Sequence, residues 1–255
     1  MILRRLVENL KQQHWTAIAI ELVIVVLGVF IGMQVSNWNE ERTERLQEKG
    51  LLIRLHEDVR ESVAGQDRDL RFLKRELDDQ ALILKSLDAC IVEPADDEAF
   101  QRGINTLGYI NPPRFTRRTV NEMVAGGKAD IIRNAAIKEE LAAIVALADW
   151  RVQFFDQSAR RTEHSRYIVE GRVRFAPGRR YPDEFLGDFM GVDYDIKSLC
   201  ADPGVASAVS AISNATYERR NAYLPLLKRY RDFLPKLEAE LQARWQVNPT
   251  RTTEP

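Results

Sequence analysis

An all-α fold is predicted from three features of this 255-residue sequence. An apolar run near the N-terminus is long enough to cross a membrane. After it, apolar residues recur at gaps of three and four, which is the spacing of one helix face. Glycine and proline are scarce inside these periodic segments, and no segment shows a clear β pattern. The sequence therefore predicts an N-terminal transmembrane helix that runs into a long helix, followed by an antiparallel helical bundle.

The apolar run over residues 15–35 is interpreted as a single membrane span. A helix of about 20 apolar residues crosses the hydrocarbon layer of a bilayer. Trp15 and Trp38 flank the run, as interfacial tryptophans do. Two alternatives are a buried core helix of a soluble protein and a cleaved signal peptide. The run is longer than a signal-peptide core and no A-x-A site follows it, so the sequence favours an uncleaved anchor.

One face of the predicted span carries Glu21, Gly28 and Gly32. Both glycines fall within about 20° of Glu21 around the helix axis. A carboxylate in hydrocarbon usually faces protein, and glycines at a GxxxG spacing let a second helix approach closely. One interpretation is a helix–helix contact at these residues, with a second copy of the chain or with a partner membrane protein. The alternative is that Glu21 reaches the headgroups and that the glycines are incidental.

Basic residues in the short N-terminal tail set the predicted orientation. Arg4, Arg5 and Lys11 precede the span, and positively charged flanks tend to stay in the cytoplasm. We therefore expect a single-pass protein of the bacterial inner membrane, with a cytoplasmic N-terminus and a periplasmic C-terminal domain. The predicted boundaries are 1–14 for a basic cytoplasmic tail, 15–38 for the transmembrane helix, 39–247 for the extracytoplasmic helical domain and 248–255 for a disordered tail.

The chain has two cysteines, Cys90 and Cys200, and each follows a predicted helix. In an oxidising compartment they can form a disulfide between helix ends, and the alternative is a pair of free thiols. Neither cysteine has a second Cys or a His at ligand spacing, so no metal site is predicted.

The extracytoplasmic domain is expected to begin with one long helix over residues 39–89, which can continue directly from the span. Gly65 lies inside this helix and is a candidate kink. The predicted buried stripe is Leu52, Leu55, Val59, Val63, Leu70, Leu73, Leu77, Ala81, Leu84 and Leu87.

Shorter elements are expected in the middle of the chain. A helix over 97–107 leads into a proline-rich loop. The next short helix is expected to be capped by Thr116 or Thr119 and to end at Gly126-Gly127. Asn134 is expected to cap a longer helix that ends near residue 173.

The C-terminal part of the chain is predicted to be a connection followed by one long helix. Residues 176–200 are interpreted as an irregular connection. Asp202 and Pro203 are expected to begin the last helix as its N-cap and first helical residue. Pro225 and Pro235 are each expected to kink it.

No motif for catalysis, a cofactor or a metal is present in the sequence. The three histidines, His14, His56 and His164, have no His or Cys partner at metal spacing. His56 and His164 lie in charged helical segments and are expected to be solvated. The 37 basic residues are balanced by 38 acidic ones, so no broad basic surface for nucleic acid is expected.

Pairs of arginines at neighbouring or next-but-one positions recur along the chain and are expected to be solvated and paired with Asp or Glu. If they converge, they can instead bind an anionic ligand. The predicted places for any ligand pocket are the loop at 109–115 and the connection at 176–191, which are the longest irregular segments. The pairs are Arg117/Arg118, Arg160/Arg161, Arg172/Arg174, Arg179/Arg180 and Arg219/Arg220.

Two stretches resemble a family of bacterial single-span membrane proteins that is defined only as a domain of unknown function. Residues 19–42 are similar to its N-terminal signature, with Ser36 in place of an Asn in the Gln-x-Asn-Asn-Trp-Asn-Glu exit from the span. Residues 119–141 are similar to a second pattern, with Val120 in place of an aromatic residue and Gly126 in place of a serine. The resemblance implies a membrane-anchored helical domain and no reaction, because the family has no assigned activity.

Together these features predict a non-enzymatic accessory or interaction protein that one span holds in the lipid bilayer. A ligand-binding membrane sensor domain is the first alternative, and it requires a pocket at the irregular loops. A membrane-tethered enzyme without a recognisable motif is the second alternative, and it requires titratable side chains that converge in a cleft.

Overall fold

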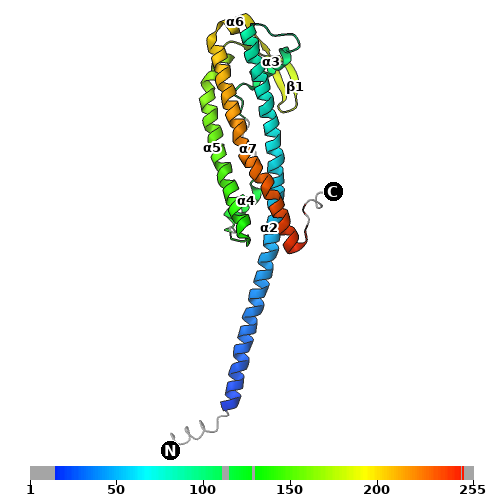
Figure 1. Ribbon diagram of the computed structural model, residues 1–255. Helices are drawn as coiled ribbons and strands as arrows, with labels where there is room; N and C mark the ends of the chain where they lie inside the picture. Colours follow the sequence, from blue (N-terminus) through cyan, green and yellow to red (C-terminus); the bar gives the residue numbers. More distant parts are fainter. Residues whose placement is uncertain (1–14, 111–114, 128–129, 248, 250–255) are drawn as a thin grey trace, which may run out of the picture. The chain divides into compact units, whose positions relative to one another are not determined.

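The computed structural model describes residues 15–110, 115–127, 130–247 and 249, and of residues 15–19 and 21 it describes only the backbone. The chain divides into two compact units, Met1–Leu51 and Leu52–Pro255. Within the described residues the predicted all-α fold is confirmed, because six helices are accompanied by only one two-stranded sheet (Figure 1). The elements are α2 (Trp15–Ala89), α3 (Asp97–Thr106), α4 (Arg118–Ala125), α5 (Ala135–Glu170), β1 (Arg174–Asp183), β2 (Gly187–Asp193), α6 (Ile196–Ala201) and α7 (Pro203–Trp245).

Both predicted tails lie outside most of the described structure. The basic tail at 1–14 is not described, and of the predicted disordered tail at 248–255 only Pro249 is described. Nothing in the structure therefore bears on either prediction.

α2 contains both the predicted span and the predicted long helix, without interruption. Gly65 lies inside α2 and does not end it. Glu41 and Arg45 form an i,i+4 ion pair at 2.5 Å on its solvated face. An 18-residue window in its N-terminal part has a mean hydropathy of 1.6, and none of that window is buried. By length and composition, this helix is able to cross a membrane.

α2 ends in a turn that Cys90 closes in the left-handed conformation, with a φ of 55°. The N–H of Ile91 donates to the carbonyl of Ser86 at 3.1 Å, and the N–H of Cys90 donates to the carbonyl of Leu87 at 3.3 Å. These two hydrogen bonds form a Schellman motif, which satisfies two of the last carbonyls of the helix. The predicted end of the long helix near residue 89 is therefore confirmed.

The second unit is built around three long helical segments: the part of α2 after Leu51, α5 and α7 (Figure 1). As the residue number rises along α2 or α5, the number of the residue that it contacts on α7 falls. α7 is therefore antiparallel to α2 and to α5. The polar pairs between α2 and α7 are His56 with Glu238, Asp67 with Arg231, and Gln80 with Thr216. The polar pairs between α5 and α7 are Asn134 with Glu240 and Arg161 with Glu218. The predicted bundle is thus present, with α2 and α5 parallel to each other.

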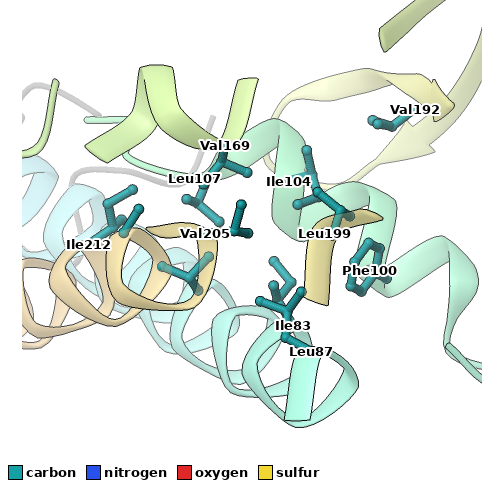
Figure 2. Packing of buried hydrophobic residues seen from close by; sticks show 12 residues of the cluster. Ile83, Leu87, Phe100, Ile104, Leu107, Val169, Val192, Leu199, Val205 and Ile212 are labelled. Atoms are coloured by element: carbon teal, nitrogen blue, oxygen red, sulfur yellow. The ribbon is translucent and has the colours of Figure 1, made fainter. Parts of the chain in front are cut away.

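A hydrophobic cluster fills the bundle near the C-terminal end of α2 (Figure 2). Phe100 of α3, Leu199 of α6 and Val209 of α7 are each at most 1% exposed. Full burial of a side chain of this size stabilises a fold by roughly 1.5–3 kcal/mol. The other buried members are Ile83, Leu87, Ile104, Leu107, Val169, Val192, Val205, Ala208 and Ile212. This cluster joins α3, α6 and the sheet to the long helices.

Residues 174–193 form a β-hairpin, so the prediction of an irregular connection without β structure is wrong for this segment. β1 and β2 pair antiparallel, from Arg174 opposite Asp193 to Asp183 opposite Gly187. A bulge between Ala176 and Arg180 interrupts the register and accommodates Pro177 and Gly178. These two residues also hide the strand pattern in the sequence, because proline and glycine normally mark turns.

α3 holds the hairpin from outside the sheet. The amide of Asn105 donates to the carbonyl of Met190 at 2.7 Å. The N–H of Val192 donates to the side-chain oxygen of Gln101 at 2.8 Å. Because these partners lie far away in the sequence, no local pattern in the strands reveals them.

The predicted caps of α5 and α7 are confirmed. The side chain of Asn134 accepts hydrogen bonds from the N–H of Ala136 at 3.0 Å and of Ile137 at 3.3 Å. Asp202 accepts one from the N–H of Gly204 at 2.9 Å, and Pro203 follows it as the first residue of α7. α5 ends at Glu170, and α7 remains helical through both of its internal prolines.

The cap of α4 differs from the prediction, because neither threonine caps it with its own side chain. Instead, Asp58 of α2 accepts a hydrogen bond from the N–H of Thr119 at 2.8 Å. Ser62 of α2 accepts one from the N–H of Thr116 at 3.1 Å. The start of α4 is therefore satisfied by another helix, and α4 is tied to α2 by the same contacts.

Candidate functional site

The face predicted to make a helix–helix contact lies in the first unit. A Cβ built at Gly28 or Gly32 would meet nothing within 4 Å, so both glycines open onto free space. The apolar side chains around them are more than half exposed. The side chain of Glu21 lies outside the described residues. The glycine face is therefore accessible to lipid or to a second helix.

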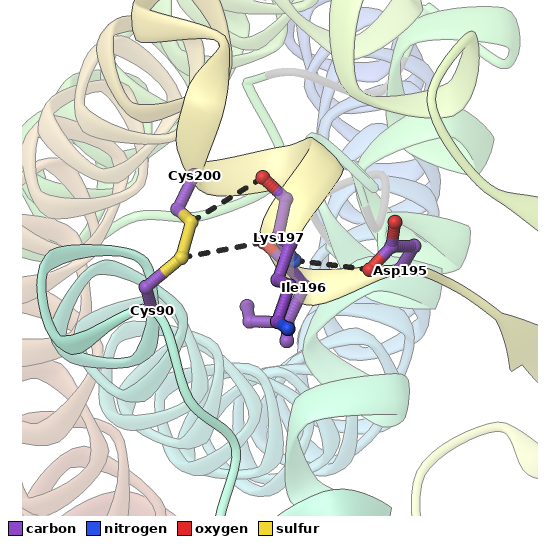
Figure 3. Close-up of a disulfide and its surroundings, with 5 residues drawn as sticks. All are labelled: Cys90, Asp195, Ile196, Lys197 and Cys200. Atoms are coloured by element: carbon purple, nitrogen blue, oxygen red, sulfur yellow. Dashed lines mark hydrogen bonds between the residues drawn. A yellow bond between two sulfur atoms is a disulfide. The ribbon is translucent and has the colours of Figure 1, made fainter.

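Cys90 and Cys200 are joined in a disulfide, with their Cα atoms 5.6 Å apart (Figure 3). The bond links the end of α2 to α6, where Asp195 begins the helix by accepting a hydrogen bond from the N–H of Lys197 at 3.1 Å. The cysteines are 110 residues apart in the sequence. Closing a loop of that length removes about 4–5 kcal/mol of unfolded-state entropy in the chain-entropy model.

A row of polar side chains lies inside the bundle and is a feature that the sequence analysis missed. Glu76 of α2, Arg151 of α5 and Arg219 of α7 are each 1% exposed. The same three helices also bury the polar side chains of Gln66, Asp69, Gln80, Ser158, Thr162, Thr216 and Tyr223. The sequence does contain a pattern that could have predicted this row, because the polar residues of α2 recur at helical spacing and therefore share one face. We call these residues the buried polar row.

Arg219 makes the central hydrogen bonds of the buried polar row. Its Nη1 donates to the carbonyl of Tyr109 at 3.0 Å, and its Nη2 donates to Oγ1 of Thr216 at 2.7 Å. The same hydroxyl accepts from Nε2 of Gln80 at 3.1 Å. Arg219 thereby connects α7 to the loop after α3, and the hydroxyl of Thr216 connects α7 to α2.

Glu76 is the most perturbed acid of the row. Burial raises its pKa from 4.5 to about 8, although the nearby Arg219 and Arg75 oppose the change. Neither carboxylate oxygen has a hydrogen-bond partner among the described residues. Burial also lowers the pKa of Arg151 to about 10, which still leaves that guanidinium charged at neutral pH. The buried polar row therefore contains the polar groups whose burial costs the domain the most free energy.

A cavity of about 430 Å³ lies between α5 and the loop after α3. The loop contributes Gly108, Tyr109 and Ile110, and α5 contributes Ala159, Arg160, Thr162, Glu163, Arg166 and Tyr167. The cavity coincides with the first of the two places predicted for a ligand pocket, and the 176–191 segment does not line it. Its volume falls within the range of small-molecule sites, about 300–1,000 Å³.

The loop wall of the cavity is fixed by contacts on several sides. Gly108 adopts a positive φ of 70°, which favours glycine. The N–H of Tyr109 donates to the carbonyl of Thr106 at 2.8 Å, and its carbonyl accepts from the buried Arg219 at 3.0 Å. The ring of Tyr109 packs edge-on against Phe72 of α2, with 5.8 Å between centroids. This wall is therefore formed before any ligand arrives.

Some of the charged side chains that line the cavity have a hydrogen-bond partner among the described residues, and one does not. Nε of Arg166 donates to Oε1 of Glu170 at 2.6 Å, and the hydroxyl of Tyr167 donates to Oε1 of Glu163 at 3.1 Å. Arg160 is exposed and has no hydrogen bond or ion pair among the residues that the structure describes. Among the described residues, Arg160 is thus a charged group of the cavity without a hydrogen bond or counterion, whereas Glu163 has no counterion but accepts a hydrogen bond from the neutral Tyr167.

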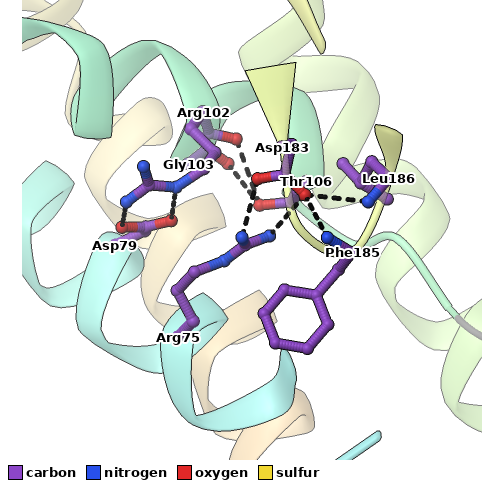
Figure 4. A network of polar contacts seen from close by, with 8 residues as sticks. All are labelled: Arg75, Asp79, Arg102, Gly103, Thr106, Asp183, Phe185 and Leu186. Atoms are coloured by element: carbon purple, nitrogen blue, oxygen red, sulfur yellow. Dashed lines mark hydrogen bonds and ion pairs between the residues drawn. The ribbon is translucent and has the colours of Figure 1, made fainter. Parts of the chain in front are cut away.

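A separate polar network anchors the hairpin to α2 (Figure 4). Arg75 donates to both carboxylate oxygens of Asp183, at 2.6 and 3.3 Å. Burial opposes ionisation of Asp183, but hydrogen bonds from Leu186, Arg75 and Phe185 outweigh it and lower its pKa. The guanidinium of Arg75 also lies 4.6 Å from the ring centroid of Phe185. Beside this pair, Arg102 of α3 binds Asp79 of α2 at 2.7 and 2.9 Å.

The histidines are not brought together into a catalytic or metal site. His56 is only 1% exposed, so the prediction of a solvated side chain is wrong for it, and its Nε2 lies 3.0 Å from Oε1 of Glu238. The reason is that His56 lies on the part of α2 that contacts α7, as its contact with Glu238 shows. His164 is exposed, as predicted, and His14 lies outside the described residues. Within the described part of the chain, no group of three His, Cys, Asp or Glu side chains could hold a metal ion.

Six of the ten arginines in the five predicted pairs form ion pairs with carboxylates, as predicted. Arg219 is buried in the polar row instead, and Arg160, Arg174 and Arg220 have no carboxylate partner among the described residues. The ion pairs are Arg117 with Asp149, Arg118 with Asp58, Arg161 with Glu218, Arg172 with Asp202, Arg179 with Asp193, and Arg180 with Asp188. These pairs serve the packing of the surface and do not converge on one ligand.

Comparisons with known proteins found no relative of this chain. No protein-family model, no curated protein and no solved structure matches the chain. The resemblance to a family of single-span membrane proteins therefore stays a prediction. What the chain does has to be inferred from its own geometry and chemistry.

Proposed function

We propose that this chain is a single-span protein of the bacterial inner membrane that acts through contact with other proteins. The supporting observation is the N-terminal part of α2, whose apolar window is not buried at all. In water, an exposed apolar surface of this extent promotes aggregation, whereas lipid or a second helix covers it. The basic residues before it, Arg4, Arg5 and Lys11, favour a cytoplasmic N-terminus.

The disulfide supports an extracytoplasmic position for the helical domain. Disulfides persist in oxidising compartments such as the periplasm and are rare in the cytosol. A bond between Cys90 and Cys200 is therefore expected only if the chain after the span is exported. This topology places residues 1–14 inside and residues 39–247 outside.

A contact function is favoured over catalysis by the positions of the titratable groups. Glu76 and His56 are buried, and neither lines the cavity beside Tyr109, where Glu163 is the one carboxylate among the described lining residues and no histidine or second acid joins it. A general acid or base must reach a substrate within hydrogen-bond distance. The accessible feature of the span is instead the face of Gly28 and Gly32, which allows close approach of a second helix.

Photo-crosslinking in the native membrane tests the contact. A photoreactive amino acid at Val35 lies on the glycine face, and the same amino acid at Val26 lies on the opposite face. We expect a defined protein adduct, from a second copy or from a partner, at Val35 and mainly lipid adducts at Val26. Lipid adducts alone at both positions would remove the span as a contact surface.

A further inference from the structure

The cavity beside Tyr109 combines two aromatic rings with one unpaired cation. Tyr109 is 40% exposed and Tyr167 is 60% exposed, so each ring offers surface to a ligand. Arg160 lines the same cavity and has no counterion among the described residues. We propose that this cavity binds a small organic anion with a flat apolar body, such as a one- or two-ring aromatic carboxylate. This binding goes beyond the contact function of the span and does not depend on it.

The charge of the ligand follows from the pairing around the cavity. Arg166 is engaged by Glu170, and Glu163 is engaged by Tyr167. The guanidinium of Arg160 remains, and its parallel N–H groups match the two oxygens of a carboxylate. A neutral ligand would leave this cation without a partner, and a cationic ligand would be repelled by it. Glu163 keeps its own negative charge but already accepts a hydrogen bond from Tyr167, so the open N–H groups of Arg160 are the place where a carboxylate of the ligand would bind.

The shape of the ligand follows from the remaining walls. Tyr109, Tyr167, Ile110 and Ala159 supply aromatic and aliphatic surface. Tyr109 is held by Phe72 behind its ring and by hydrogen bonds on both sides of its peptide unit, so it provides a fixed stacking surface. The cavity volume of about 430 Å³ has room for one or two rings and a carboxylate.

Titration calorimetry on the full chain in lipid nanodiscs tests the proposal. The probes are benzoate, phenylacetate and naphthoate. Naphthamide has the same body as naphthoate without its charge, and acetate has the charge without the body. We expect saturable binding of at least one aromatic carboxylate. Naphthamide and acetate should each bind about tenfold more weakly or worse, which is the size of one lost charged hydrogen bond or one lost apolar contact.

Two adjacent arginines provide a matched pair of variants. Arg160→Gln removes the unpaired cation of the cavity, whereas Arg161→Gln removes a guanidinium that pairs with Glu218 on α7. Arg160→Gln should weaken carboxylate binding by about tenfold, and Arg161→Gln should change it by less than about twofold. Tyr167→Leu, a substitution at an exposed ring, should weaken binding of naphthoate more than that of benzoate because it removes stacking surface.

Three results would overturn the proposal. The first is the absence of saturable binding of all three carboxylates to a chain whose melting transition shows that it is folded. The second is equal binding of naphthoate and naphthamide. The third is an equal effect of Arg160→Gln and Arg161→Gln. None of these results tests the proposed contact of the span, because the crosslinks at Val35 and Val26 report on that contact separately.

Discussion

Glu76 of α2 and Arg219 of α7 are both buried inside the bundle, each 1% exposed, and attract each other electrostatically. Arg219 nevertheless directs its hydrogen bonds to Tyr109 and Thr216, and neither oxygen of Glu76 has a partner among the described residues. Attraction alone does not compensate the desolvation of the carboxylate, because its pKa is raised to about 8. Glu76 is therefore protonated at neutral pH, and the pair is a charged arginine beside a neutral acid.

This pair makes stability depend on pH. The folded-state pKa of Glu76 lies above its unfolded value, so the folded protein binds more protons between the two values. The contribution of Glu76 to stability is therefore fully present below about pH 4.5 and is lost as the pH rises to about 8, at a rate of roughly 1 kcal/mol per pH unit. Glu76→Gln imitates the protonated acid and should remove this slope in urea unfolding of the full chain in detergent.

An exposed acid of α2 is the control for that measurement. Asp78 pairs with Lys74 on the surface, with both side chains largely exposed, so Asp78→Asn should keep the slope of the original chain. If Glu76→Gln and the original chain lose the same free energy of unfolding between about pH 5 and pH 9, Glu76 does not carry the raised pKa.

The disulfide is predicted to form in the cell and to stabilise the domain. Alkylation of free thiols before and after reduction should find Cys90 and Cys200 protected until a reductant is added. Replacing both by serine should lower the free energy of unfolding by about 2–5 kcal/mol. The reduced original chain should melt at the same temperature as the double-serine variant. Free thiols in the unreduced chain would contradict both the bond and an oxidising compartment.

The pair of Arg75 and Asp183 is predicted to hold the hairpin on α2. Asp183 is nearly buried, with its side chain 3% exposed, and it also accepts from the N–H groups of Phe185 and Leu186 at 2.8 Å each. Asp183→Asn should therefore cost about 1.5–3 kcal/mol of stability. Because the pKa of Asp183 is lowered by folding, this stability is present above about pH 4 and is lost as the pH falls further.

The matched control for the hairpin lies on the same two strands. Arg180 and Asp188 form an exposed ion pair, with side chains 58% and 50% exposed. Asp188→Asn should cost less than about 1 kcal/mol. Equal costs for the two substitutions, measured by urea unfolding, would show that Asp183 does not anchor the hairpin.

The glycine face of the span is predicted to support self-association or contact with a partner span. Replacing Gly28 and Gly32 by leucine adds side chains on that face and should lower the signal in a membrane dimerisation reporter. Val26→Leu, on the opposite face, is the control and should leave the signal unchanged. An unchanged signal in the double-leucine variant would discard self-association through these glycines.

Local sequence rules were sufficient where a residue acts on its immediate neighbours. Asn134 and Asp202 cap their helices through N–H groups two or three residues away, so their role is visible in the sequence. The continuous α2 follows from the absence of proline between the span and Cys90. The cavity was also located correctly, because the proline-rich loop after α3 cannot be helical.

The rest of the fold depends on contacts between distant segments. The hairpin relies on Gln101 and Asn105 of α3, and the start of α4 relies on Asp58 of α2. On α2 the predicted apolar stripe includes Ala81, which is exposed, while Gln80 beside it is buried against Thr216. Hydrophobic periodicity selects apolar residues by definition, so it passes over a helix face that buries polar groups against polar partners.

The topology of the chain tests the central claim most directly. Fusions of alkaline phosphatase and of green fluorescent protein after residue 247 report on opposite sides of the inner membrane. Alkaline phosphatase is active only outside the cytoplasm. Green fluorescent protein fluoresces only inside, because it does not become fluorescent when it is exported through the general secretion pathway. We predict high phosphatase activity and no fluorescence, since the basic N-terminal tail and the disulfide both favour an external domain. Fluorescence without phosphatase activity would place the helical domain in the cytoplasm and contradict the proposed function.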